Sequence, residues 1–423
     1  MAHRVVLASA AAVGGIAAAR FATMERSDTH TISTATQQFF VFGALKLVGI
    51  WARGRHDDDC REFQKVQEEV LHDILERRTK TAYGSEKQFD NMLASEDIIS
   101  AFRTRHPVTT YSYWSSWVDR IANGEPNVLN KEPEKMLAAT SGTSGRRALL
   151  PGTKQQSATF FTRGILVVFD VLRRTVPSCY ELQKSCKLAF APTWTYAPGG
   201  LKIGPNSSDP TDPSFRKLLP ILYSTPEAGY KISHDEQAAI YIHALFAARD
   251  SNLGILEANF VNLPHRLLSV LRDHGHSIAN DIEHGRLSHS VAAKLDASVV
   301  EKLERSLGGG DPRRAQALRD ALLAEHTHDA GTRVGLARRV WPNLRLILSN
   351  ATGASFEPYA NQLRSDLATG VPILSTMFVF LLMHYCYGVT FVVLSTPHSC
   401  HPPSLPLTSP HPLALPVDYR PLL

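Results

Sequence analysis

A run of hydroxyl-bearing and glycine residues, Thr-Ser-Gly-Thr-Ser-Gly, carries the most specific chemical signal in this sequence. Gly142 and Gly145 can adopt positive φ, which lets backbone N–H groups converge on an anion. Ser141, Thr143 and Ser144 supply hydroxyl donors that bind phosphate oxygens without a charged side chain. The run therefore predicts a phosphate-binding loop, and it points to ATP chemistry.

The surroundings of this run exclude one common class of nucleotide site and support another. No Lys-Ser or Lys-Thr pair follows the second glycine, so the run does not match the P-loop of GTPases and related ATPases. Apolar residues recur at helical spacing over residues 157–174 and predict a helix soon after the run, where backbone dipoles favour an anion. The alternative interpretation of the hexapeptide alone is a polar surface turn.

Short apolar runs and periodic segments elsewhere predict the scaffold. Residues 187–191 and 253–257 are typical of buried strands, and a helix is expected over residues 263–273. Strands that alternate with helices in this way indicate an α/β fold with helices covering a sheet.

Further short motifs occur in a fixed order around the hydroxyl-glycine run. They are His-Pro-Val-Thr-Thr-Tyr at 106–111, Ile-Ala-Asn-Gly-Glu at 121–125, Trp-Pro-Asn-Leu at 341–344 and Ala-Thr-Gly-Ala at 351–354. In order and spacing, over about residues 40–377, the sequence resembles the Gretchen Hagen 3 family. That family contains the plant auxin-responsive acyl-acid amido synthetases and relatives outside plants.

The resemblance implies the large α/β N-terminal domain of an adenylate-forming ligase. Such an enzyme uses ATP and Mg²⁺ to convert an organic acid into an acyl-adenylate, which the amine of an amino acid then attacks. The resemblance gives Ser141, Thr143 and Ser144 the role of binding phosphate, and it sets Thr352 and Gly353, after a strand-like run at 344–348, against the nucleotide. The alternative for this second loop is an ordinary strand-to-helix turn. No catalytic residue and no metal ligand of this chain is assigned.

The family pattern breaks after Met377. Family members continue into a Tyr-Gly-x-Ser-Glu motif whose glutamate helps to hold magnesium, whereas this chain continues Phe-Val-Phe-Leu-Leu-Met-His-Tyr. The family's ribose-binding aspartate motif and its smaller C-terminal domain also have no counterpart. We therefore expect a truncated, impaired ligase with a large domain at 39–377 and a divergent tail at 378–423.

The tail is apolar at first and rich in proline, serine and histidine from residue 398, a composition that favours disorder. A membrane-embedded tail at 378–394 is the alternative, but that run is short for a spanning helix. At the other end, residues 5–19 form a small-residue apolar run between Arg4 and Arg20, so residues 1–38 predict a targeting segment or anchor. A secretory signal, an anchor and a transit peptide each fit parts of this run.

An ATP-consuming ligase suits a cytoplasmic or organellar location, with the N-terminus as a candidate for membrane association. A second apolar patch at 39–52 fits an amphipathic first helix of the large domain better than a second membrane segment.

Composition sets the outer limits on function. A chain of 423 residues with 43% hydrophobic and 20% charged residues can bury a large core. The formal net charge of +5 comes from scattered basic residues, which predicts no nucleic-acid partner. The 5 cysteines include no Cys-x-x-Cys pair, and the histidines between residues 265 and 289 lack a ligand spacing, so no disulfide framework or metal site is predicted.

Two classes of function follow from the sequence. The first is an ATP-dependent acid–amino acid ligase acting on small organic acids and amino acids, or its impaired remnant. The second is a non-catalytic protein that binds a nucleotide, an acid or a partner protein.

Overall fold

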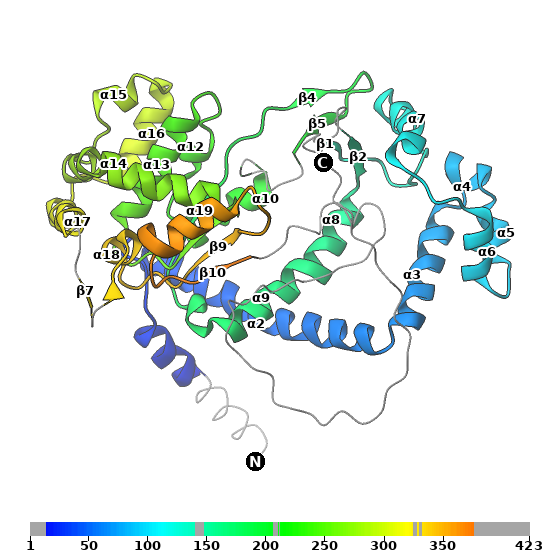
Figure 1. The fold of residues 1–423 in the computed structure, drawn as a ribbon, viewed down its shortest axis with the longest axis horizontal. Coiled ribbons are helices and arrows are strands. Elements are labelled where there is room, and N and C mark those ends of the chain that lie inside the picture. The colour runs from blue at the N-terminus through cyan, green and yellow to red at the C-terminus, as the bar shows by residue number, and fades with distance from the viewer. Residues whose placement is uncertain are drawn as a thin grey trace, which may run out of the picture.

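The computed structural model describes residues 14–139, 148–205, 210, 212–324, 328–329 and 332–375, which form a mixed α/β fold (Figure 1). The hydroxyl-glycine run lies outside the described residues, as does the tail from residue 376. Within the described part of the chain, every helix is too short or too polar to cross a bilayer.

A parallel sheet forms the centre of the larger part of the fold. Its strands are β3 (Ser185–Leu188), β6 (Ile255–Phe260), β9 (Leu346–Asn350) and β10 (Ile373–Leu374), in the order β10-β9-β6-β3. All of its pairings are parallel, so the strands end at the same edge of the sheet. This edge is where ligands bind in open α/β sheets.

The side chains of β9 show how the sheet is buried on both faces. Successive residues of a strand point to opposite faces. Leu346 and Leu348 pack in a cluster with the helix α9 (Leu166–Thr175), whereas Ile347 packs in the large core with α13 (Glu236–Arg249) and α14 (Asn262–His284). A strand covered on both sides needs apolar residues at consecutive positions, which explains the continuous apolar run in the sequence.

One face of the sheet is covered by a thick helical layer. Its main helices are α13 (Glu236–Arg249), α14 (Asn262–His284), α16 (Ala297–Leu307), α17 (Pro312–Leu323) and α18 (Leu336–Val340). Most of α13 is buried on all sides, which is expected of a helix held between a sheet and further helices.

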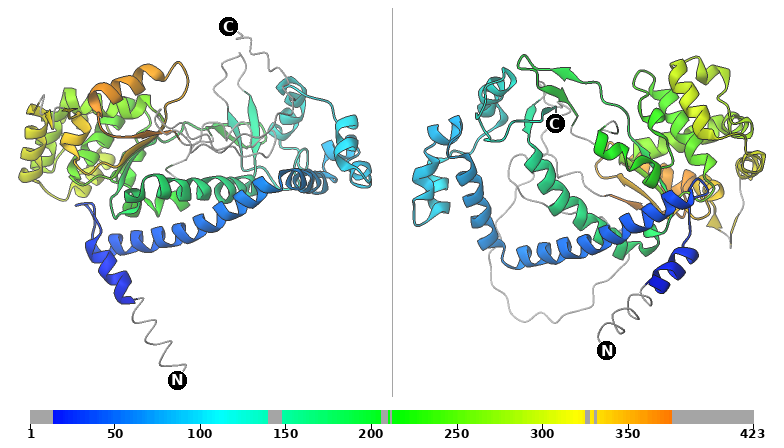
Figure 2. Two further views of the ribbon diagram at one scale, coloured as in Figure 1. Left: turned by 60° about the horizontal axis from the view of Figure 1, so that its bottom comes forward. Right: turned by 180° about the vertical axis from the view of Figure 1, so that it is seen from behind.

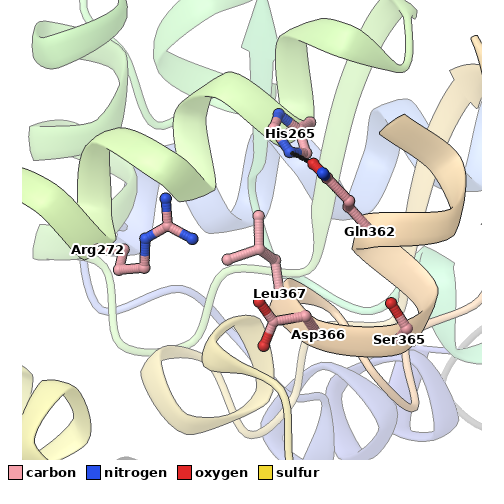
Figure 3. Close-up of a pocket in the computed structure, with 6 residues that line it drawn as sticks. All are labelled: His265, Arg272, Gln362, Ser365, Asp366 and Leu367. Atoms are coloured by element: carbon pink, nitrogen blue, oxygen red, sulfur yellow. Dashed lines mark hydrogen bonds between the residues drawn. The ribbon is translucent and has the colours of Figure 1, made fainter. Parts of the chain in front are cut away.

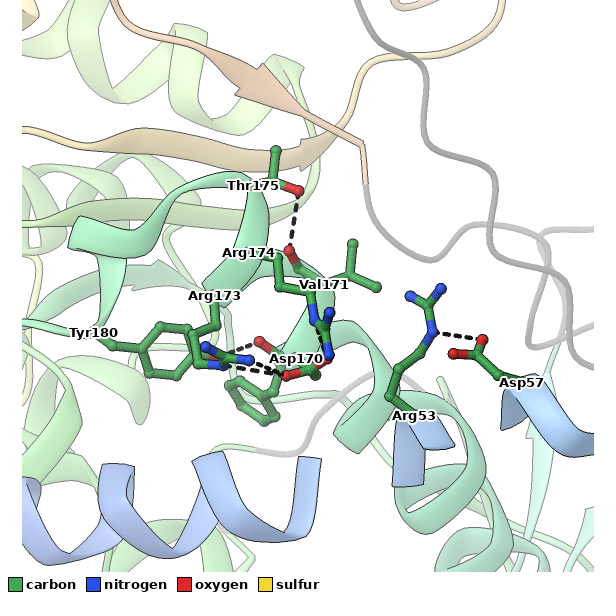
Figure 4. A network of polar contacts seen from close by, with 9 residues as sticks. Arg53, Asp57, Asp170, Val171, Arg173, Arg174, Thr175 and Tyr180 are labelled. Atoms are coloured by element: carbon green, nitrogen blue, oxygen red, sulfur yellow. Dashed lines mark hydrogen bonds and ion pairs between the residues drawn. The ribbon is translucent and has the colours of Figure 1, made fainter. Parts of the chain in front are cut away.

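The other face is covered by α9 (Leu166–Thr175), and α9 in turn packs against the long helix α2 (Ile32–Arg61). Gly49 permits close approach, because a Cβ there would lie 3.2 Å from the carbonyl oxygen of Leu166. Asp170, whose side chain is fully buried, accepts hydrogen bonds from Arg173 and Arg174 on its own helix (Figure 4). Burial opposes ionisation of Asp170, but these two arginines hold its pKa below the ordinary value.

A second, smaller sheet lies beside the first. Its strands are β1 (Met136–Ala139), β2 (Leu149–Gly152), β4 (Thr195–Tyr196) and β5 (Lys202–Gly204), in the order β2-β1-β5-β4. It packs with α7 (Tyr111–Ala122) and the neighbouring short helices around Trp117, Ile121 and Leu137.

The remaining elements are short helices and one small hairpin. They are α3 (Phe63–Arg78), α4 (Ala82–Glu86), α5 (Phe89–Leu93), α6 (Ile98–Arg105), α8 (Lys154–Phe160), the π-helix η1 (Phe161–Ile165), the 3-10 helix η2 (Pro177–Tyr180), α10 (Pro213–Arg216), α11 (Leu219–Leu222), α12 (Glu227–Tyr230), α15 (His289–Ala292), α19 (Glu357–Gln362), the π-helix η3 (Leu363–Leu367), β7 (His328–Asp329) and β8 (Thr332–Arg333).

The predicted elements are present with shifted boundaries. The helix expected at 157–174 consists of α8, η1 and α9, and it begins at a capping box formed by Thr153 and Gln156. The helix expected at 263–273 continues to His284, where Gly285 ends it in the left-handed conformation. The apolar patch at 39–52 lies within the helix α2 (Ile32–Arg61).

Candidate functional site

The candidate site lies at the carboxyl edge of the parallel sheet, in the turn between β9 and α19. Thr352 and Gly353, the second predicted loop, follow β9 directly at this edge. These two residues lie in a strand-to-helix turn, and the turn lies at the edge where ligands bind in folds of this class.

Asn350 fixes this turn through its carboxamide oxygen. The Oδ1 atom of Asn350 accepts a hydrogen bond from the backbone N–H of Thr352 at 3.2 Å and another from the Thr352 hydroxyl at 2.7 Å. An Asn side chain that binds backbone two residues later is a typical turn-forming contact. Asn350 belongs to none of the motifs that predicted the site, although an Asn at the end of an apolar strand is a signal for such a turn.

Two further contacts hold the turn from either side. The backbone N–H of Ala351 donates to Ser375 Oγ at 3.0 Å, which joins the ends of β9 and β10. The ring of Phe356 stacks on the ring of Phe260 at the end of β6, with 5.1 Å between ring centroids. Gly353 has a φ of +101°, and a Cβ at this residue would meet no atom within 4 Å. The glycine is required here by its backbone conformation and leaves open space beside it.

Buried polar atoms without partners gather at this edge. Within the described residues, the Nδ2 atom of Asn350 and the Oγ atom of Ser349 are buried and make no hydrogen bond. The same holds for Oδ1 of Asn262, at the start of α14 directly after β6. Buried polar groups are normally paired, so Nδ2 of Asn350 and Oδ1 of Asn262 each indicate a place for a ligand or for water, whereas the Ser349 hydroxyl points to the opposite face of the sheet from Asn350.

An ion pair lies nearby within the sheet. Lys187 on β3 donates to Glu257 on β6, which is adjacent to Leu348 of β9 in the strand register. The ammonium group of Lys187 also lies 5.8 Å from the ring centroids of Phe215 and of Tyr223. In the sequence, Lys187 stands only as the first residue of a predicted buried strand. Because Glu257 balances its charge, Lys187 does not act as a free cation toward the edge.

The first predicted loop is represented in the structure by its two ends. Ser141, Gly142, Thr143, Ser144 and Gly145 lie outside the described residues. The strands on either side, β1 and β2, form an antiparallel pair that ends at the register pair Ala139 and Leu149.

Tyr111 anchors one end of this predicted loop. Its hydroxyl accepts from the Leu149 N–H at 2.7 Å and lies 3.2 Å from the Leu149 carbonyl oxygen. Tyr111 was noted only as the last residue of a family-like motif, and its structural role is to fix the start of β2.

Other residues of the family-like motifs are scaffold. Trp341 is fully buried, and its Nε1 donates to the carbonyl oxygens of Ala247 at 2.9 Å and Asp250 at 3.0 Å. Gly124 has a φ of +89° and lies against Gly199, where a Cβ on Gly199 would come within 2.3 Å of the Gly124 nitrogen. These residues position the sheets and make no contact at the carboxyl edge.

A separate hollow lies between α14 and the α19–η3 segment (Figure 3). Its volume is about 520 Å³, and its lining residues are His265, Arg272, Gln362, Ser365, Asp366 and Leu367. His265 and Gln362 are hydrogen-bonded to each other across its wall. Thr352 and Gly353 are not among the residues that line it.

The donors at the carboxyl edge fit a nucleotide better than a free metal ion. The amide of Asn350 offers an N–H donor, and the turn brings no carboxylate with it. Across the described parts of the chain, no cluster of three or more His, Cys, Asp or Glu residues could hold a metal ion. Mg²⁺ at this edge would therefore depend on phosphate oxygens of a bound nucleotide.

Comparison with known proteins agrees with the architecture. The probable indole-3-acetic acid-amido synthetase GH3.13 of Oryza sativa subsp. japonica is 28% identical over 327 residues, which cover 74% of this chain and 66% of that protein. The indole-3-acetic acid-amido synthetase GH3.8 of Oryza sativa subsp. indica is 28% identical over 336 residues, which cover 76% of this chain and 51% of that protein. This chain thus spans between half and two thirds of the length of these relatives.

A solved structure shares the fold. The GH3.15 acyl acid amido synthetase superposes with a TM-score of 0.62 at 24% identity, over 74% of this chain and 53% of that one. The family model described as the GH3 family N-terminal domain matches residues 52–373. The chain therefore belongs to the GH3 family, and its α/β fold is that of the family's N-terminal domain.

Proposed function

We propose that this chain carries the nucleotide-binding part of an ATP-dependent acyl-acid amido synthetase. In the first half-reaction an oxygen of the organic acid attacks the α-phosphorus of ATP, and the bond to pyrophosphate breaks. In the second half-reaction the amine nitrogen of an amino acid attacks the acyl carbonyl, AMP leaves, and the amine loses a proton. A carboxylate is a poor electrophile because it has no good leaving group. Adenylation supplies one, since AMP can leave from the acyl carbon.

The observation that supports this proposal most directly is the turn at the carboxyl edge. Asn350 holds Thr352 in place, Gly353 leaves open space, and the Nδ2 atom of Asn350 is buried without a partner in the described residues. A phosphate or ribose oxygen placed there would satisfy that donor. The edge lies inside the segment that matches the family.

In this proposal the hydroxyl-glycine loop between β1 and β2 binds phosphate oxygens through Ser141, Thr143 and Ser144. The two loops would then approach each other within the span of one nucleotide, because contacts to one ligand must converge. Small organic acids and amino acids are the proposed substrates, and Mg²⁺ would accompany the ATP phosphates.

We further propose that the 423-residue chain is an impaired form. After Met377 its sequence departs from the Tyr-Gly-x-Ser-Glu pattern that carries the acidic group on the magnesium side. Adenylation should therefore be slow and amide formation undetectable. The same departure favours a second candidate function, a non-catalytic protein that binds a nucleotide or an acid.

Pyrophosphate exchange tests the enzymatic proposal. Purified chain is incubated with ATP, Mg²⁺ and a panel of aromatic and aliphatic acids, and acid-dependent transfer of labelled pyrophosphate into ATP is measured. Slow exchange with some acids supports the ligase, and ATP binding without exchange favours the non-catalytic alternative. Absence of both ATP binding and exchange would contradict the ligase and also a nucleotide-binding protein, and would leave only a protein that binds an acid. Robust formation of acid–amino acid conjugates would overturn the proposed impairment.

A further inference from the structure

The helix α2 has a free apolar face. Large apolar side chains are exposed along it at positions that recur with helical spacing, which are Ile32, Phe40, Leu47, Val48, Ile50 and Trp51. Phe40 is 68%, Leu47 70% and Trp51 57% exposed. We call these residues the outer face of α2. Single exposed apolar residues are common, but a continuous row on one helix marks an interaction surface.

The opposite side of α2 is the side that packs against the rest of the fold. Ala35, Gln38, Gly49 and Ala52 are the buried residues of the helix. In the part where α9 packs against α2, Gly49 faces the backbone of α9. Leu47 and Trp51 are each two residues from Gly49, which places them on the far side of the helix. The outer face thus contributes nothing to the packing on α9.

The chain N-terminal to α2 adds a second apolar feature on the same side. Residues 14–23 form a helix in which Ile16 is 71% exposed. Figure 2 shows this helix leaving the body of the protein beside α2, on the side away from α9. It continues the apolar sequence that begins at Val5. The whole outer face and all of this helix precede residue 52, where the match to the family begins.

The charges around the outer face are predominantly basic. Lys46 lies at the edge of this face, one helical turn before Ile50, and the guanidinium of Arg55 lies 5.9 Å from the ring centroid of Trp51. Neither residue has an acidic partner among the residues that the structure describes. The acidic residues at the end of α2 are each paired with an arginine, namely Asp57 with Arg53, Asp58 with Arg61, and Asp59 with Arg163. A surface that covers this face should therefore be apolar with anionic groups at its border.

We propose that the outer face of α2, together with the helix at residues 14–23, docks on the surface of an anionic lipid bilayer. An α-helix of this length is about 45 Å long and would lie flat in the interface, with its apolar row among the upper acyl chains. Tryptophan prefers the level of the headgroups, where Trp51 and its neighbour Arg55 would lie. Lys46 and Arg55 would meet anionic headgroups, which attract basic side chains at this depth. This docking does not depend on the proposed catalytic function.

Vesicle co-sedimentation of the full chain tests the proposal. We expect binding to vesicles of phosphatidylcholine with 30% phosphatidylserine, and weaker binding to vesicles of phosphatidylcholine alone. The double variant Leu47→Gln with Trp51→Gln should bind on the order of tenfold more weakly, because it lacks two apolar side chains whose transfer from water into the bilayer favours binding. Higher salt should reduce binding to the anionic vesicles by screening Lys46 and Arg55.

A matched control comes from two equally exposed apolar residues elsewhere. Phe63 on α3 is 57% exposed and Leu323 on α17 is 69% exposed, and the double variant Phe63→Gln with Leu323→Gln should bind as the wild type does. A Trp51→Leu variant should keep its binding but lose quenching of tryptophan fluorescence by brominated lipid. Equal loss of binding in both double variants would overturn the proposal.

Two other results would also contradict lipid docking. One is failure of the wild type to bind either vesicle. The other is self-association of the wild type in analytical ultracentrifugation that the double variant Leu47→Gln with Trp51→Gln abolishes, while vesicle binding stays unchanged. In that case the outer face of α2 would join two copies of this chain. Thermal unfolding of each variant separates these results from loss of the fold.

Discussion

Asn350 and Thr352 are joined by two hydrogen bonds to a single atom. The Oδ1 atom of Asn350 accepts from the hydroxyl of Thr352 at 2.7 Å and from its backbone N–H at 3.2 Å. Both donors of Thr352 are thereby held at the carboxyl edge of the sheet. The other half of the Asn350 carboxamide, Nδ2, has no partner among the described residues and is available to a ligand.

Substitutions of Asn350 should separate the two halves of its side chain. Asn350→Ala removes the acceptor for Thr352 and should lower the free energy of unfolding by about 1–2 kcal/mol. Asn350→Asp keeps an acceptor for Thr352 but replaces the Nδ2 donor with an oxygen, so ATP should bind about tenfold more weakly. Calorimetric titration with ATP and thermal unfolding measure the two effects.

Ser349→Ala serves as the control for these variants. It removes a buried hydroxyl that has no partner in the described residues and should change stability by less than about 0.5 kcal/mol. If Asn350→Asp binds ATP as tightly as the wild type, Asn350 is a turn-forming residue and nothing more.

The hydroxyl-glycine loop should control nucleotide affinity. Thr143→Ala and Ser144→Ala should each weaken ATP binding by about 1 kcal/mol or more, because each removes a hydrogen bond to a charged phosphate. Gly142→Val should weaken binding further, since a β-branched residue resists positive φ. Isothermal titration of the wild type and the three variants is the measurement. Equal affinities for all four proteins would mean that the run is an ordinary turn.

Two of the glycines of α2, Gly49 and Gly43, should respond in opposite directions to the same substitution. Gly49→Leu should destabilise the protein by about 1–3 kcal/mol, because a Cβ there already lies 3.2 Å from the Leu166 carbonyl oxygen. Gly43→Leu should stabilise it by about 0.5–1 kcal/mol through helix propensity, since a Cβ at Gly43 meets no atom within 4 Å. Chemical denaturation measures both. A similar change in both variants would argue against close packing of α2 on α9.

A histidine near the start of α2 should contribute to the loss of stability in acid. His30 is hydrogen-bonded to Thr34 and Gln38, and burial, followed by the charge of Lys184, lowers its pKa from 6.5 to about 4. Between pH 6.5 and 4 the unfolded chain binds this proton and the folded chain does not, so the free energy of unfolding decreases as the pH falls.

His30→Gln should flatten this part of the stability profile. Between pH 6.5 and 4, the free energy of unfolding of this variant should fall by about 1–2 kcal/mol less than that of the wild type, after allowance for solvent screening of a half-buried group. The exposed His289→Gln is the matched control and should leave the slope unchanged. A His30→Gln profile parallel to that of the wild type would contradict neutral burial of His30.

Local patterns in the sequence were sufficient for the fold class and for the few elements that were predicted. Consecutive apolar residues in β9 reflect burial on both faces of one sheet, and helical periodicity reflects one packed face, so each can be read within a short window. The order of the short motifs was sufficient for the family. Element boundaries depended on capping contacts such as Thr153 with Gln156, and they shifted by a few residues.

Only the tertiary structure decided which residues of the motifs act together. The hydroxyl of Tyr111 meets Leu149, 38 residues away, and the rings of Phe260 and Phe356 stack across two neighbouring strands. The free amide of Asn350 and the exposed row on α2 likewise depend on which surfaces the packing covers. Hydrogen bonding and burial between distant segments are set by the packing of the whole chain, and no periodicity in one window encodes them.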